Sequence, residues 1–166
     1  VWIMGYGVDE YGEKMRKSKG NVIDPFPIIS KHGADTFRFW SAIEANHGQD
    51  FRCSEQKIGE AQKFLTKLWN IGRFVSSFEF IPSYEFDLLS SDKWILGELS
   101  NLVAECIKGY KEYNFFIPAS QIREFTWNIF ASHYLELVKS RAYNDQVPNN
   151  RYSALYALHK CFSVIL

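Results

Sequence analysis

The 166-residue sequence has no net charge, because 19 lysines and arginines balance 19 aspartates and glutamates. A chain-wide electrostatic attraction to nucleic acid is therefore excluded, and only local basic clusters can bind phosphate. No apolar run approaches the roughly 20 residues that a membrane-spanning helix needs. The first four residues, Val-Trp-Ile-Met, also lack the basic segment and cleavage site of a secretory signal. These absences favour a cytoplasmic protein.

Cysteine and histidine are too few and too dispersed to indicate a metal site. The three cysteines form no CxxC pair and lie in apolar surroundings, which predicts reduced, buried thiols. The four histidines are interpreted as structural side chains. These residues are Cys53, Cys106, Cys161, His32, His47, His133 and His159. We expect no metal ligands among them. The content of 46% hydrophobic and 17% aromatic residues predicts a globular chain.

The hydrophobic pattern predicts a short β region followed by helices. We expect a strand over 2–8, a basic loop over 13–21, a short helix with Pro27 in its first turn, and a helix over 34–45. Four longer helices should begin near residues 55, 92, 118 and 151, with loops at 79–90 and 144–150. Short links between such helices indicate a bundle.

The first long helix has an apolar stripe in steps of three and four residues. The stripe consists of Ile58, Ala61, Leu65, Leu68, Gly72 and Val75. The sequence begins within the predicted strand, and residues 162–166 continue a helical pattern without a residue that would end the helix. We expect both ends to be cut from a longer protein.

Four positive charges lie within six residues of the basic loop: Lys14, Arg16, Lys17 and Lys19. Gly12 and Gly20 flank them, and glycine lets a backbone approach a ligand closely. On pattern alone, three interpretations remain: contact with a polyphosphate, a solvated hairpin, or a basic signal or nucleic-acid patch.

The order of residues 14–21, Lys-Met-Arg-Lys-Ser-Lys-Gly-Asn, resembles the KMSKS signature of class I aminoacyl-tRNA synthetases. Arg16 stands where the signature has its first serine. Residues 21–25, 33–38 and 48–52 are similar in order and spacing to the valine/isoleucine/leucine branch of that family. Residues 67–74 and 134–139 resemble the valine enzymes more than the isoleucine enzymes, and residues 92–96 resemble the start of the anticodon-binding domain.

The resemblance implies a mainly α fold, with a short β-hairpin and loop from a Rossmann-type catalytic domain before an anticodon-binding helical bundle. It implies three segments. Residues 1–54 are the end of the catalytic domain with the KMSKS loop and stem-contact region, and 55–88 are a connecting helix and loop. Residues 89–166 are the anticodon-binding bundle, cut at its C-terminal end.

The implied activity is ATP-dependent activation of an amino acid, most closely valine, and its transfer to tRNA. Lys17 and Lys14 are the implied catalytic residues, and the loop that binds the ATP phosphates is Lys14, Met15, Arg16, Lys17 and Ser18. Mg²⁺ is expected to accompany ATP. A His-x-Gly-His signature, the other half of such a site, occurs nowhere in the sequence. We therefore expect these 166 residues to be inactive alone.

The implied partner is a tRNA, specifically a valine isoacceptor, with no membrane or DNA partner. The residues expected to contact tRNA are Lys19, Lys63, Lys67, Arg73 and Arg123, and the alternative for each is a solvated surface charge. The alternatives for the whole chain are an isoleucine or leucine enzyme of the same branch, a stand-alone RNA-binding module, or a structural bundle whose loop matches by accident.

Overall fold

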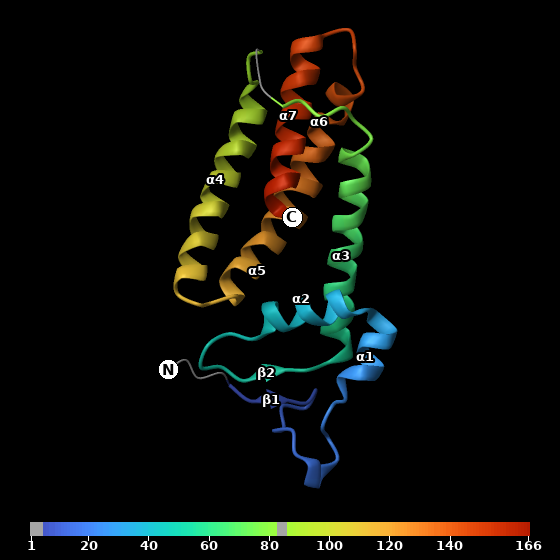
Figure 1. Cartoon of the computed structure of the whole chain (residues 1–166), viewed down its shortest axis with the longest axis vertical. Helices are drawn as coiled ribbons and strands as arrows, with labels where there is room; N and C mark the ends of the chain where they lie inside the picture. The colour runs from blue at the N-terminus through green and yellow to red at the C-terminus, as the bar shows by residue number, and fades with distance from the viewer. Residues whose placement is uncertain (1–4, 83–85) are drawn as a thin grey trace. The chain divides into compact units, whose positions relative to one another are not determined.

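The computed structural model describes residues 5–82 and 86–166, and helices dominate both stretches (Figure 1). The described chain forms two compact units. Unit 1 comprises the described residues up to 66 together with 106–120, and unit 2 comprises 67–105 and 121–166. The predicted mainly α fold with a small β element is confirmed. No helix in the described stretches has both the length and the apolar composition needed to cross a membrane.

The β element of unit 1 pairs two short strands in parallel. β1 (Gly7–Val8) lies beside β2 (Phe51–Arg52), and Val8 also makes a single antiparallel bridge to Lys14. The expected hairpin is present only as this bridge, because β1 takes its main partner from a distant part of the chain. Gly5 permits the approach, since a Cβ there would lie 1.9 Å from the carbonyl oxygen of Gln49. Residues 1–4 of the predicted strand lie outside the described residues.

Two short helices follow, as the sequence predicts. α1 (Pro25–His32) begins after Asp24, whose carboxylate accepts a hydrogen bond from the Phe26 N–H at 3.0 Å and caps the helix. α2 (Ala34–Glu44) corresponds to the helix predicted over 34–45. The buried core of unit 1 includes Trp40 and Ile43 of α2 together with Cys53, Ile58 and Ala61.

The apolar stripe of α3 (Glu55–Val75) differs from the predicted one. Phe64 and Ile71 are buried, whereas Leu65 and Leu68 are only partly buried. The Phe64 ring stacks on Phe39 of α2, with ring centroids 4.7 Å apart. This aromatic contact places the neighbouring position, and not Leu65, in the core.

Unit 2 contains the first part of α4 (Ser90–Lys111), the last part of α5 (Phe116–Glu124), η2 (Phe125–Tyr134), α6 (Leu135–Ala142) and α7 (Pro148–Ile165). α7 begins at Pro148, within the stretch predicted as a turn, because proline fits the first position of a helix. The predicted loop at 79–90 precedes α4, and residues 83–85 of it lie outside the described residues.

The predicted helix over 118–143 is continuous, but its middle part, η2, is π-helical. The wider turns place residues five apart on one face. Phe125 therefore stacks on Phe130 with centroids 6.2 Å apart and an interplanar angle of 7°. Phe130 in turn stacks on Tyr134 at 6.1 Å. This aromatic column is buried, which gives a reason for the unusual hydrogen-bonding pattern.

A buried polar network joins the helices of unit 2. Asp92, at the start of α4, has no exposed surface, and Arg141 of α6 donates to both of its carboxylate oxygens at 2.7 and 2.8 Å. The Tyr134 hydroxyl donates to the same carboxylate at 2.8 Å, and the Ser153 hydroxyl of α7 donates to it as well. Burial raises the pKa of the Asp92 carboxyl, but the bonds from Arg141, Ser153 and Tyr134 outweigh burial and leave that pKa below its ordinary value.

The three cysteines are free and buried, as predicted. Cys161 lies near the polar network, and burial followed by the Asp92 charge raises the pKa of its thiol to about 12. A thiol with so high a pKa stays protonated near neutral pH and behaves as a small apolar side chain.

Replacing Arg141 with alanine should destabilise the chain by about 3–5 kcal/mol, because it leaves the buried Asp92 carboxylate without its cation. Urea unfolding of both proteins measures the difference. The stabilisation from Asp92 should be complete above the ordinary aspartate pKa of about 3.9 and should be lost as pH falls through the lower folded value. Arg73→Ala removes an exposed arginine of the same unit and should change stability by less than about 0.5 kcal/mol. Equal effects of the two substitutions would contradict the assigned role of the network.

Candidate functional site

The basic loop is held at its base by backbone hydrogen bonds. The Asp9 N–H donates to the Glu13 carbonyl at 2.9 Å, and the Met15 N–H donates to the Gly7 carbonyl at 3.2 Å. The bridge from Val8 to Lys14 lies between these bonds. The loop therefore projects from β1 on a fixed stem.

The tip of the loop is one turn of 3₁₀ helix, η1 (Lys17–Lys19). It follows Arg16, which is extended with φ −143° and ψ 138°, and it ends at Gly20 in the left-handed region with φ 69°. The Lys19 N–H donates to the Arg16 carbonyl at 3.0 Å, and the Gly20 N–H donates to the Lys17 carbonyl at 3.2 Å. Glycine at position 20 permits this turn without a steric penalty.

The Asn21 side chain links the two sides of the loop through hydrogen bonds. Its Oδ1 accepts a hydrogen bond from the Arg16 N–H at 2.8 Å. Its Nδ2 donates to Asp9 Oδ2 at 2.9 Å and to the Lys14 carbonyl at 3.3 Å. Sequence reasoning used Asn21 as a residue that closes the loop and for the family resemblance, and it missed these side-chain hydrogen bonds. The available signal was an aspartate at the start of the loop and an asparagine at its end.

Asp9 is the acceptor around which the stem is built. Its Oδ1 accepts from the Tyr11 N–H at 3.0 Å and from the Glu13 N–H at 2.8 Å. The Asn21 amide, followed by the Glu13 N–H, stabilises the carboxylate and lowers the pKa of Asp9 below its ordinary value. Asp9 is therefore ionised at neutral pH.

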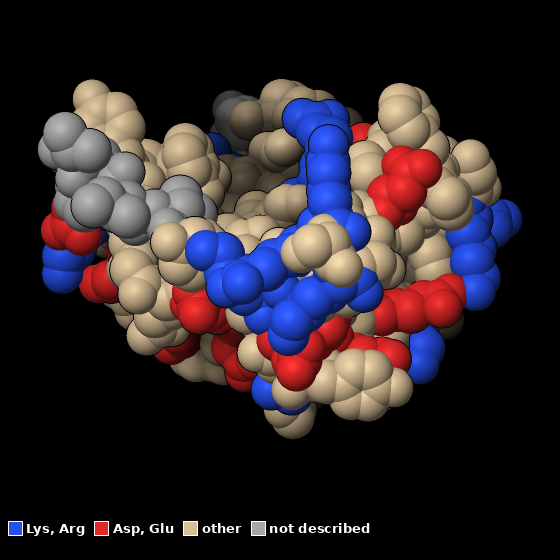
Figure 2. All heavy atoms as spheres, turned by 90° about the horizontal axis from the view of Figure 1, so that it is seen from below, with Lys and Arg blue, Asp and Glu red and all other residues tan. Residues whose placement is uncertain are grey.

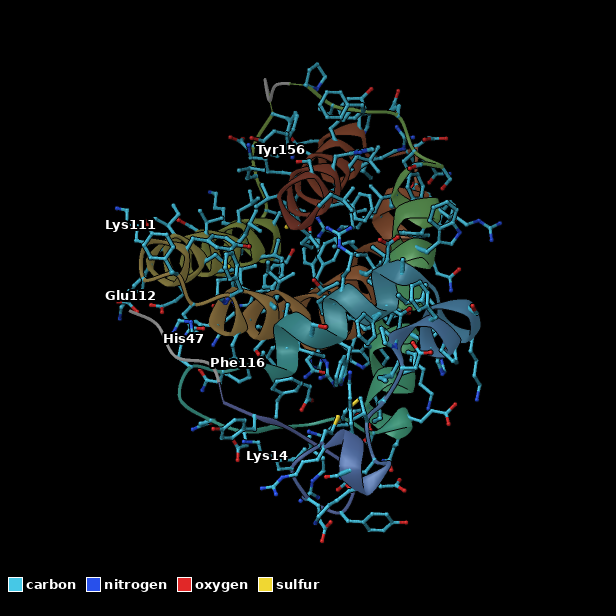
Figure 3. All side chains as sticks on the ribbon, turned by 60° about the horizontal axis from the view of Figure 1, so that its bottom comes forward. Lys14, His47, Lys111, Glu112, Phe116 and Tyr156 are labelled. Carbon is cyan, nitrogen blue, oxygen red and sulfur yellow. The ribbon has the colours of Figure 1, made fainter. Side chains whose placement is uncertain are left out.

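Two of the four loop cations have partners within unit 1. The Lys14 ammonium, labelled in Figure 3, lies 3.1 Å from the centroid of the Tyr6 ring in a cation–π contact. Lys19 forms an ion pair with Glu13 at 2.7 Å. Arg16 and Lys17 are exposed, and neither side chain has an ion pair with any described residue. Ser18 is exposed beside them, and Met15 is partly buried.

The surface at this end of unit 1 is basic. Figure 2 views the molecule from the end that carries the loop and shows lysine and arginine side chains gathered there, with carboxylates around them. The loop thus offers exposed positive charge on a fixed backbone, and this combination suits binding of an anion such as a phosphate chain.

A cavity of about 580 Å³ lies beside the stem of the loop. Its polar lining includes Asp9, Asn21 and His32, and its apolar lining includes Ile23, Ile28, Cys53 and Ile58. The His32 ring is oriented by Gln62, whose Oε1 lies 2.8 Å from Nδ1. Burial raises the pKa of the Cys53 thiol, so this cysteine is not an activated nucleophile.

The residues expected to contact tRNA are divided between the units. Lys19 and Lys63 are exposed in unit 1, and Arg73 is exposed in unit 2. Arg123, also in unit 2, is partly buried. Lys67 is partly buried, with its ammonium 4.3 Å from the centroid of the Trp127 ring and 3.4 Å from the Ser132 hydroxyl. A ligand would have to draw Lys67 away from these contacts.

Two family models match separate parts of the chain. The model described as tRNA synthetases class I (I, L, M and V) matches residues 1–54, which include the loop. The model described as anticodon-binding domain of tRNA ligase matches residues 92–166.

The sequence is similar to curated valine–tRNA ligases over most or all of its length. It is 39% identical over 166 residues to the valine–tRNA ligase of Nanoarchaeum equitans, covering 100% of this chain and 21% of the relative. It is 49% identical over 148 residues to the valine–tRNA ligase of Aeropyrum pernix, covering 87% of this chain and 18% of the relative. The chain belongs to the valine–tRNA ligase family. It spans about a fifth of the length of these relatives.

Two solved structures have the same fold. One is the Agrobacterium radiobacter K84 agnB2 LeuRS in a ternary complex with tRNA and LeuAMS, with a TM-score of 0.71, 18% identity, and coverage of 98% of this chain and 20% of that chain. The other is the Mycobacterium tuberculosis methionyl-tRNA synthetase in complex with methionyl-adenylate. Its TM-score is 0.73 at 17% identity, covering 98% of this chain and 33% of that chain.

Replacing Asn21 with alanine should open the loop, because three hydrogen bonds are lost together. Tryptic cleavage after Arg16 and Lys17, followed by mass spectrometry, should become faster by on the order of tenfold. Asn101→Ala removes an exposed asparagine from α4 and serves as the matched control. Equal cleavage rates for wild type and Asn21→Ala would show that the Asn21 hydrogen bonds do not restrain the loop.

Proposed function

We propose that this chain is the part of a valine–tRNA ligase that supplies the ATP-phosphate loop and tRNA-binding helices. The reaction is activation of valine by ATP to valyl-adenylate, followed by transfer to valine tRNA. One observation carries the site assignment: Lys17 is exposed and without an ion pair among the described residues, on a loop whose stem is fixed by Asp9 and Asn21. The proposed location is the cytoplasm.

The proposed organisation follows three segments. Residues 1–54 close the catalytic domain with the phosphate loop and stem-contact region, and residues 55–88 connect it to the helical part. Residues 89–166 belong to the anticodon-binding bundle. The matches of separate family models to 1–54 and 92–166 support this division.

The proposed chemistry needs cations more than a general base. The valine carboxylate is already ionised at neutral pH, so it can attack the α-phosphate directly while pyrophosphate leaves. Such a step depends on alignment and on neutralisation of the leaving phosphates. Lys17 would contact the β- and γ-phosphates, with Lys14 and the Ser18 hydroxyl in support and Met15 securing the loop against the unit 1 core.

Mg²⁺ would accompany the ATP phosphates and neutralise part of their charge. Within the described residues, no group of three or more His, Cys, Asp or Glu side chains is placed to hold a metal ion. Mg²⁺ bound through the ATP phosphates needs no such cluster of side chains, and no step is assigned through it.

Lys17→Ala, made in the complete ligase that carries this chain, should slow valine-dependent pyrophosphate exchange. The expected loss is on the order of 10²–10³, as for removal of other charge-stabilising groups. Lys160→Ala removes an exposed lysine from α7 and should leave the rate unchanged. The 166 residues alone should give no pyrophosphate exchange. Exchange activity of the isolated chain would contradict the proposal that it supplies only part of the active site.

The isolated chain should bind valine tRNA more tightly than isoleucine tRNA, and a changed anticodon should weaken binding. Filter binding at two salt concentrations measures both effects. Substituting Lys63, Arg73 or Arg123 by alanine should reduce the slope of log affinity against log salt by about 1 for each lost phosphate contact. Equal and strongly salt-dependent binding to all three tRNAs would contradict specific recognition of valine tRNA and would instead indicate a non-specific RNA-binding module.

A further inference from the structure

Arg16 presents a charged side chain from an anchored backbone. Its N–H donates to Asn21 Oδ1 at 2.8 Å, and its carbonyl accepts from the Lys19 N–H at 3.0 Å. Both backbone polar groups are therefore bound, and the extended conformation at Arg16 is fixed. The guanidinium has no ion pair or side-chain hydrogen bond with any residue that the structure describes.

The other cations of the loop differ in how available they are. Lys14 would have to leave the Tyr6 ring, and Lys19 would have to leave Glu13, before either could bind a new anion. Arg16 and Lys17 need no such exchange. They are consecutive residues, and both are exposed.

We propose that Arg16 binds the triphosphate of ATP together with Lys17 and retains pyrophosphate after it forms. This inference rests on the proposed function of the loop. A guanidinium is planar and always charged, and its fork of donors matches two phosphate oxygens at once. The serine of the signature offers one neutral hydroxyl, so Arg16 adds a cationic contact that the signature itself does not specify.

The contact should act on both the substrate and the product. ATP and pyrophosphate present the same β- and γ-phosphate groups, so a side chain that binds one also binds the other. Binding shared by ground states lowers the KM for ATP without a matching increase in kcat. The valine KM depends on other parts of the ligase and should not respond to Arg16.

The test is a set of substitutions in the complete ligase, read out by pyrophosphate exchange and by pyrophosphate inhibition of aminoacylation. Arg16→Ser, which restores the signature residue, should raise the KM for ATP and the inhibition constant of pyrophosphate by on the order of tenfold to a hundredfold. The valine KM should stay unchanged. Arg16→Lys keeps the charge but loses the fork, so its effect should be smaller.

Arg38→Ser is the matched control, because the Arg38 side chain is 82% exposed in the same unit and its ion pair among the described residues is with Asp35 at 3.5 Å. It should change neither constant. If Lys17→Ala slows exchange while Arg16→Ser leaves both constants unchanged, the Arg16 contact is refuted and the proposed function stands. If neither substitution affects exchange, the phosphate role of the whole loop is refuted.

Discussion

Asp92 lies at the start of α4 with no exposed surface, and its carboxylate accepts hydrogen bonds from η2, α6 and α7. A buried charge raises the free energy of the folded state unless it is both paired and hydrogen-bonded. Arg141 provides the pair, and Tyr134 and Ser153 complete the hydrogen bonding. Each of these side chains must reach the same two oxygen atoms, so four elements of unit 2 are positioned by one carboxylate.

An acidic side chain also organises the loop of unit 1, although in an exposed setting. Asp9 accepts from two backbone N–H groups and from the Asn21 amide. The backbone is therefore held by an aspartate and an asparagine, and not by the basic side chains. The side chains of Arg16 and Lys17 form no ion pair with any described residue, which leaves their charge for a ligand.

The helices of this chain were predictable because their information is local. Apolar spacing, the Asp24 cap and the positions of Pro27 and Pro118 each act within a few residues. The π-helical segment could not be predicted in this way, because a stripe read at 3.6 residues per turn does not register the five-residue spacing of Phe125 and Phe130. The parallel partner of β1 was equally hidden, since two-residue strands carry no usable pattern.

The loop was recognisable from residue order, but the roles of its members were not. Sequence treated Lys14, Arg16, Lys17 and Lys19 as one cluster, whereas their availability depends on Tyr6 and Glu13. The contact between the Lys67 ammonium and the Trp127 ring likewise depends on the tertiary structure. Tertiary contacts decide which of these cations acquires a partner, and the order of charges along the sequence does not show those contacts.

The short β element joins residues that lie far apart in the sequence. The Tyr6 N–H reaches the Asp50 side chain across 44 residues, in the same pairing that sets β1 beside β2. Closing so long a segment costs chain entropy, which local helices such as α1 and α2 do not incur. A ribosome adds about 5–20 residues per second, so β1 waits about 2–9 seconds for β2 to be synthesised. During that interval the loop projects from an unpaired strand, and the basic end of unit 1 is completed only after β2 has been synthesised.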